Sequence, residues 1–138
     1  MQMETRVQTA LEKHRSGYNC AQAVLCTYAD AFGLNERDAY KIAEGFGTGM
    51  GGMGETCGAV TAAFMLIGLK NSNGELGNKA TRPDTYKQIR ELAESFKAEA
   101  GSITCHELKG ATGLPVYPCP KCVETAARLV EKYLKSNG

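Results

Sequence analysis

The sequence predicts an all-α fold: a single-domain bundle, residues 1–138, of six or seven helices around a central apolar helix at about 57–69. Two observations lead to this prediction. Apolar residues recur along most of the chain at the three- and four-residue spacing of one helix face. Alternating apolar and polar runs between turn residues, which would indicate strands, are missing. The 138 residues are enough for one core that needs no disulfide or metal to hold it.

The first half of the chain shows the helical spacing before the central helix begins. Two helix faces come first: Val7, Ala10, Leu11 and His14, and then Ala21, Val24, Leu25 and Tyr28. Asn35, with Asp38 three residues later, is expected to cap a third helix. The predicted inner face of that helix consists of Ala39, Ile42, Ala43 and Phe46. The segment 57–69 is apolar nearly all round, which indicates a helix buried on every side.

Proline and glycine set the expected bounds of the remaining helices. Pro83 is predicted to open a long amphipathic helix that Gly101 ends. The predicted inner face of this helix is Tyr86, Ile89, Ala93 and Phe96. Ser102 is expected to cap a short turn of helix, and the last helix is expected to begin near Pro120. That last helix is predicted to bury Val123, Ala126, Ala127, Val130 and Leu134.

Composition excludes several classes of function. The formal charge of +1 gives no reason to expect nucleic acid or an anionic membrane as a partner. Tryptophan is absent, so base stacking has little to work with. The first residues lack the apolar stretch and cleavage site of a secretory signal, and the longest apolar run is about half the length of a membrane span. We therefore expect a cytoplasmic protein without membrane insertion.

Six cysteines are notable in a reducing compartment, where cysteines are more often catalytic or metal-binding than structural. Four of them fall near predicted helix starts. Cys20 follows Ser16 or Asn19 as the cap, and Cys57 opens the central helix. Cys105 and Cys122 are each third in a helix if Ser102 and Cys119 are the caps. Because a helix N-terminus stabilises a thiolate, Cys20, Cys57, Cys105 and Cys122 are the predicted site, as catalytic thiols or as metal ligands.

The other two cysteines differ. Cys26 lies about 240° around the helix from Cys20 and is predicted to be an apolar filler. Cys119 forms a C-P-K-C sequence with Cys122, which three alternatives explain: a redox pair, half of a metal site, or two unrelated thiols at a helix start. A thioredoxin-like pair would need a βαβ context, and none is predicted. His106, next to Cys105, is a candidate base, while His14 is expected to be a surface or packing residue. Tyr18, Asn19 and Glu55 flank the cysteines and are candidates for supporting contacts.

Seven glycines lie between residues 45 and 58 and include two overlapping G-x-G-x-x-G strings. A dinucleotide site would need a preceding strand and a later acidic residue, and a phosphate loop would need a lysine. Neither context is present. Glycine also allows positive φ and close backbone approach, so the tract is interpreted as a collar without side chains that leads to Cys57. Its predicted cofactor-binding residues are Gly51, Gly52, Gly54 and Gly58.

Four segments together, SGYNCAQAV, GFGTGMGGMGETCGAVTAA, GSITCHEL and CVETAARLV, carry a resemblance. The chain resembles the C_GCAxxG_C_C family, which is named after its cysteine pattern and is regarded as redox-active. The resemblance implies that the defining cysteines are Cys20, Cys57, Cys105 and Cys122, which leaves Cys26 and Cys119 outside the set. Ala62 stands where a glycine usually closes the central motif. Family members are often encoded beside transporter genes, which implies a transporter-linked partner.

Three hypotheses for function follow. The four cysteines bind an iron–sulfur cluster or another thiolate-bound metal, although their spacing matches no standard ferredoxin or zinc pattern. Alternatively, they exchange disulfides with an unknown redox partner through a thiolate such as Cys57. In the third hypothesis the chain is a non-catalytic helical interaction module, with structural cysteines and a homo-oligomer interface on helix 57–69. Both redox hypotheses predict that the four cysteines converge in the fold.

Overall fold

A computed structural model describes residues 5–136 and has the predicted all-α class. The described residues contain no strand, and their only bridge pairs Thr56 with Thr104. The helical segments are α1 (Val7–Arg15), α2 (Cys20–Tyr28), α3 (Glu36–Ala43), α4 (Gly47–Met50), α5 (Gly58–Asn71), α6 (Arg82–Ala100), α7 (Cys105–Leu108) and α8 (Cys119–Ser136), with 3-10 turns η1 (Ala29–Phe32) and η2 (Glu44–Phe46). Because Thr48 and Gly49 inside α4 have left-handed dihedrals, α4 is a tight turn. The described part thus has seven regular α-helices.

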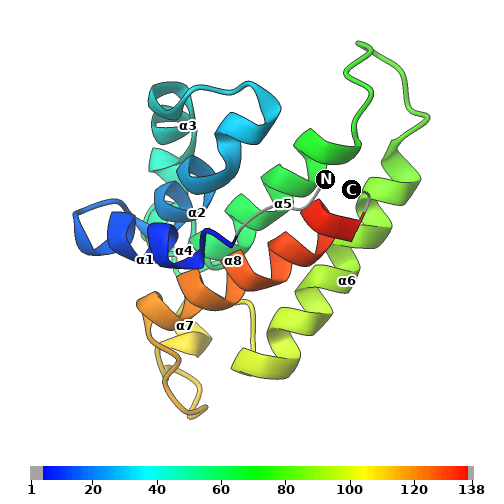
Figure 1. Cartoon of the computed structure of the whole chain (residues 1–138). Coiled ribbons are helices and arrows are strands. Elements are labelled where there is room, and N and C mark those ends of the chain that lie inside the picture. The colour runs from blue at the N-terminus through cyan, green and yellow to red at the C-terminus, as the bar shows by residue number, and fades with distance from the viewer. Residues whose placement is uncertain (1–4, 137–138) are drawn as a thin grey trace.

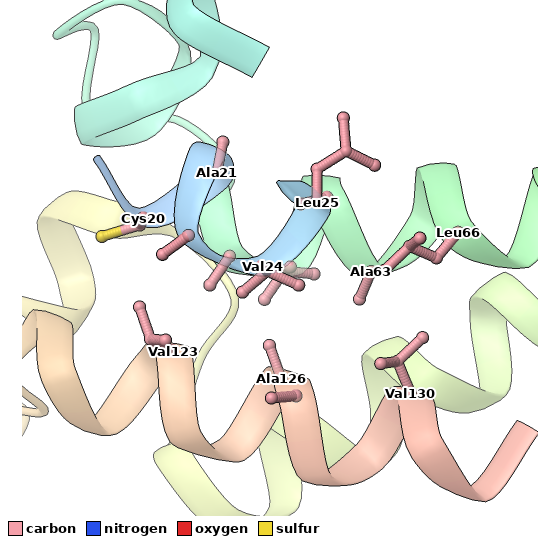
Figure 2. Packing of buried hydrophobic residues seen from close by; sticks show 14 of the residues in the cluster. Cys20, Ala21, Val24, Leu25, Ala63, Leu66, Val123, Ala126 and Val130 are labelled. Carbon is pink, nitrogen blue, oxygen red and sulfur yellow. The ribbon is translucent and has the colours of Figure 1, made fainter. Parts of the chain in front are cut away.

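The core lies where α2, α5 and α8 meet, and α1 and α6 cover it. Figure 1 shows α8 crossing in front of α5, with α6 on one side and α1 and α2 on the other. In Figure 2, residues of α2 and α5 such as Val24 and Ala63 lie above α8 and face Ala126. All three are fully buried. Alanines at such facing positions let the helix backbones approach closely.

Several predicted helix ends are confirmed. The Asn19 side chain accepts the Gln22 amide in a capping box at the start of α2, and Asn35 caps α3 by accepting the Asp38 amide. Gly101, with φ of 96°, ends α6. α5 begins one residue after Cys57 and packs against α2, α6 and α8.

Two predicted buried faces need correction. Ile42 of α3 is 50% exposed, because this short helix turns only Ala39 and Ala43 into the core. Tyr86 of α6 is 55% exposed, since it stands before the stretch of α6 that reaches the core. Leu92 and Phe96, one turn apart, are the residues that α6 buries there.

Two predicted caps also shift. Thr104 occupies the N-cap of α7, so Cys105 is the first helical residue and not the third. Ser102 contributes from two positions upstream: its hydroxyl accepts the Thr104 amide and donates to Glu107. α8 starts at Cys119 itself, which places Cys122 at its fourth residue. Each shift is by one or two residues, so both cysteines remain in a first turn. Within residues 5–136 the helices are too short or too polar to cross a membrane.

Candidate functional site

Five cysteines line one small cavity of about 20 Å³. They come from the starts of four helices, and they are Cys20, Cys57, Cys105, Cys119 and Cys122. All are free thiols; four are buried and Cys119 is half-buried. The remaining wall is formed by Thr48, Gly49, Gly58, Leu108, Lys109 and Tyr117. The structure therefore brings together the four cysteines predicted as the site and adds a fifth.

The start of α2 places Cys20 on the cavity wall. The capping box of Asn19 and Gln22 fixes Cys20 as the first helical residue. Figure 2 shows Cys20 at the end of α2 that faces the Val123 end of α8. The Nε2 atom of His14 lies 3.9 Å from the Cys20 sulfur. His14, which the sequence analysis treated as a surface or packing residue, is thus beside the site.

A short antiparallel pairing holds Cys57 beside Cys105. The Cys57 amide donates to the Ile103 carbonyl at 2.8 Å, and the Cys105 amide donates to the Glu55 carbonyl at 2.6 Å. The bridge between Thr56 and Thr104 lies between these two bonds. The backbone thus fixes two cysteines that are far apart in the sequence.

The glycine collar brings bare backbone against these segments. Gly49 has φ of +66°, and a Cβ there would lie 2.6 Å from the Cys105 Cβ and 2.7 Å from the Glu55 nitrogen. A Cβ on Gly58 would lie 2.6 Å from the Phe46 carbonyl oxygen. The chain can close around the cavity only because both positions lack a side chain.

The predicted cofactor-binding glycines divide between the wall and its surroundings. Gly58 lines the cavity. Gly51 and Gly52 are exposed and Gly54 packs beside His106, so these three lie outside the wall. Gly49, which was not among the predicted residues, lines the cavity in their place. The glycine tract thus reaches the cavity through Gly49 and Gly58.

Cys57 and Cys122 form one hydrogen-bonded thiol pair. The bond from Cys122 lowers the pKa of Cys57, and the backbone N–H groups of Val60 and Ala59 lower it further, against the effect of burial. The same bond, together with burial, raises the pKa of Cys122. The Cys122 sulfur also lies 3.7 Å from the Tyr117 carbonyl oxygen, a second acceptor for its proton. The pair therefore favours a thiolate at Cys57 and a protonated thiol at Cys122.

Cys20 and Cys119 form a second pair. The hydrogen bond from Cys20 lowers the pKa of Cys119 to about 6; burial opposes this shift, and the charges of Lys109 and His14 assist it. The same bond and burial raise the pKa of Cys20. Burial also raises the pKa of Cys105, which has Lys109 as a hydrogen-bond partner. Two pairs of thiols with opposite pKa shifts within each pair thus share one cavity with Cys105.

Cys119 lies on the cavity wall, although the resemblance leaves it outside the defining set. Its pKa is affected most by Cys20 of α2, whereas that of Cys122 is affected most by Cys57 at the start of α5. The available signal was the two-residue gap at a helix start, which keeps both sulfurs at the same end of α8.

Other candidates lie away from the thiols. Cys26 is outside the cavity and donates to the Glu36 carbonyl at 3.7 Å, in line with its predicted place on another face of the helix. The Nδ1 atom of His106 is 2.9 Å from the Gly54 carbonyl oxygen, so this exposed ring is held on the outside of the collar. The Tyr18 hydroxyl donates to Glu36. Of the three flanking residues, Asn19 caps α2, while Glu55 offers its backbone carbonyl to Cys105.

The described residues thus form an all-helical bundle in which five cysteines line one cavity. Residues 18–133 match the family model described as "Putative redox-active protein (C_GCAxxG_C_C)". The match spans most of the chain, and the protein belongs to this family. Comparison with curated proteins gave no match, and comparison with solved structures gave none.

Proposed function

We propose that the protein is a dithiol redox protein in which Cys57 and Cys122 form a reversible disulfide. The observation that carries this proposal is that Cys57 at the start of α5 and Cys122 at the start of α8 are buried and line one small cavity. The lowered pKa of Cys57 and the raised pKa of Cys122 support it. Membership of a redox-active family is consistent with it. Oxidation of the pair by a disulfide forms the Cys57–Cys122 bond and breaks the substrate S–S bond, and the substrate leaves as two thiols.

The two different environments suit the two steps of this exchange. The thiolate is the attacking form, and the N–H groups at the start of α5 hold it at Cys57. Once Cys57 is in a mixed disulfide, its negative charge is gone, and so is one cause of the raised pKa of Cys122. Cys122 can then lose its proton to the departing thiolate and attack the Cys57 sulfur. A cytoplasmic setting, where thiols are kept reduced, would return the pair to its starting state.

A redox titration tests the proposal. The protein is equilibrated with mixtures of reduced and oxidised dithiothreitol, quenched, unfolded and alkylated, and each cysteine is quantified by peptide mass spectrometry. We expect Cys57 and Cys122 to become protected together, and Cys57→Ser to leave Cys122 open to alkylation. Cys26→Ser is the control and should titrate like the unmodified protein. Cys57 and Cys122 that stay open throughout would contradict the proposal and favour the non-catalytic helical module.

A thiolate-bound metal or iron–sulfur cluster is the second candidate. The cysteines themselves support this candidate, because their sulfurs are soft metal ligands. The helix starts on which four of them lie supply backbone N–H groups that can donate to the sulfurs. The cavity of about 20 Å³ has room for about one water molecule, so a cluster does not fit it as it stands. Across residues 5–136, no three or more Cys, His, Asp or Glu side chains are grouped to hold a metal ion. Anaerobic purification with iron and labile-sulfide analysis tests this candidate, and stoichiometric amounts of both would favour it over the dithiol.

A further inference from the structure

The five cavity cysteines differ in their access to solvent. Cys57 is 4% exposed and Cys122 is 3% exposed. Cys119, the first residue of α8, is the one member of the five that is half-buried. In thiol–disulfide exchange the attacking sulfur must touch the sulfur that it attacks. A substrate disulfide is far larger than a cavity of about 20 Å³, so we expect it to meet the half-buried Cys119 before the more enclosed Cys57–Cys122 pair.

A second thiol stands directly behind Cys119. Cys20 is 7% exposed and is the hydrogen-bond partner of Cys119. Two further side chains lie near this outer pair: the exposed Lys109 is on the cavity wall, and the Nε2 atom of His14 lies 3.9 Å from the Cys20 sulfur. Cys20 and the Cys57–Cys122 pair line the same cavity. Cys119 is thus the most exposed of the five cavity cysteines, and the four buried ones lie behind it: Cys20 and Cys105 at 7%, Cys57 at 4% and Cys122 at 3%.

We propose that Cys119 and Cys20 are an outer dithiol that passes electrons between a substrate disulfide and the inner Cys57–Cys122 pair. This inference rests on the proposed function of the inner pair and assigns Cys119 as the residue that meets the substrate. The resemblance placed Cys119 outside the set of functional cysteines. In this assignment Cys119 is a catalytic residue, because its sulfur forms the bond to the substrate.

The exchange proceeds in two stages that balance. The Cys119 sulfur attacks the substrate disulfide and forms a mixed disulfide, and one substrate thiol leaves. Cys20 then attacks Cys119, and the Cys20–Cys119 disulfide forms as the second substrate thiol leaves with the proton of Cys20. In the second stage Cys57 attacks Cys20 and releases Cys119. Cys122 next attacks Cys57, releases Cys20 and gives up its proton to it. Two electrons have moved from the inner pair to the substrate, and the outer pair is again a dithiol.

The rate of inner-pair oxidation tests this order. The fully reduced, full-length protein is mixed with bis(2-hydroxyethyl) disulfide, quenched at intervals with acid and alkylated for peptide mass spectrometry. We expect Cys119→Ser to slow the protection of Cys57 and Cys122 at least about tenfold, because the thiols left behind it are enclosed and an ordinary thiol is only a few per cent thiolate at neutral pH. Cys26→Ser should not change the rate. Cys20→Ser should accumulate a hydroxyethylthio adduct on Cys119, since the resolving thiol is gone.

The outcomes separate the two proposals. An unchanged rate in Cys119→Ser, with the Cys57–Cys122 disulfide still formed at equilibrium, would overturn the outer dithiol and leave the inner pair standing. Absence of the Cys57–Cys122 disulfide at equilibrium in the unmodified protein would instead contradict the proposed function. In that case the Cys119 adduct in Cys20→Ser still reports whether the outer pair meets the substrate. Circular dichroism of each variant identifies any that fail to fold, and Cys119→Ala then serves as the second substitution.

Discussion

Cys57, at the N-cap of α5, and Cys122, one turn into α8, line the same small cavity. This relationship places two buried thiols, with a lowered pKa at Cys57 and a raised pKa at Cys122, on two helices that pack against each other. Each helix contributes its first turn, where backbone N–H groups have no partner within the helix. The cavity is therefore a place where the starts of several helices meet.

The collar glycines should differ in their tolerance of alanine. Gly49→Ala combines an unfavourable left-handed φ with contacts of 2.6 to 2.8 Å to Cys105 and Glu55. Gly52→Ala shares the positive φ but has nothing within 4 Å. We expect a loss in the free energy of unfolding of about 1–2 kcal/mol for Gly52→Ala and of at least about 3 kcal/mol for Gly49→Ala. Urea unfolding measures both, and equal losses would show that the collar does not press on Cys105.

Two glycines of α5 should respond to alanine with opposite signs. A Cβ on Gly58 would meet the Phe46 carbonyl at 2.6 Å and the Ala21 nitrogen at 3.2 Å. We expect Gly58→Ala to lower the free energy of unfolding by about 1–3 kcal/mol. Gly68 has nothing within 4 Å, so Gly68→Ala should raise it by about 0.5–1 kcal/mol through helix propensity. Stabilisation by both substitutions would mean that α5 lies further from η2 than described.

Glu131 should make stability depend on acid pH. Burial alone would raise its pKa, but hydrogen bonds from the Arg6 amide, the Tyr28 hydroxyl and Thr5 outweigh burial and lower it. A carboxylate with a lowered folded pKa adds stability above its unfolded pKa of about 4.3, and this is lost as pH falls through the folded pKa. Glu131→Gln should cost about 1–3 kcal/mol at pH 7.

The difference in the free energy of unfolding between the unmodified protein and Glu131→Gln should shrink below about pH 4, because protonated Glu131 resembles the amide. Thermal or urea unfolding of both proteins between pH 7 and pH 3 measures it. Glu99→Gln is the matched control, because Glu99 is an exposed partner of Arg128 and should change the free energy of unfolding by less than about 1 kcal/mol. A constant difference across this pH range would contradict the lowered pKa of Glu131.

The alkylation of Cys119 and Cys26 should have widely separated pH midpoints. The hydrogen bond from Cys20 lowers the pKa of Cys119 to about 6, whereas burial raises that of Cys26 to about 11. Since the thiolate reacts with iodoacetamide, the rate at Cys119 should level off above neutral pH while the rate at Cys26 keeps rising. Peptide-resolved rates from pH 5 to 10 measure both. Parallel profiles would contradict the pairing of Cys119 with Cys20.

The helical fold could be predicted from local features of the sequence, namely capping residues and the spacing of apolar residues. Asn35 and Gly101 mark helix ends by their own backbone chemistry. The apolar segment at 57–69 indicated a helix buried on every side, but Leu69 near its end is 40% exposed. The exposed positions of Ile42 and Tyr86 could not be predicted, because spacing shows which residues share a face but not how far the core extends along it.

The sequence indicated four of the five cysteines that line the cavity, but neither Cys119 nor the pairing of the thiols. Helix starts point to Cys20, Cys57, Cys105 and Cys122 one residue at a time. Which sulfurs meet depends on the packing of α2 and α5 against α8, which is a property of the folded chain. For the same reason the sequence could not show that Cys119 reaches Cys20, or that His14 approaches it.

Disulfide mapping of the oxidised protein tests the central claim most directly. Trypsin separates the relevant cysteines, since Cys57 lies in peptide 42–70, Cys119 in 110–121 and Cys122 in 122–128. After equilibration with oxidised dithiothreitol and digestion without reduction, we predict a cross-linked species joining 42–70 to 122–128 that dithiothreitol releases. Oxidised protein in which these two peptides remain separate would contradict the account.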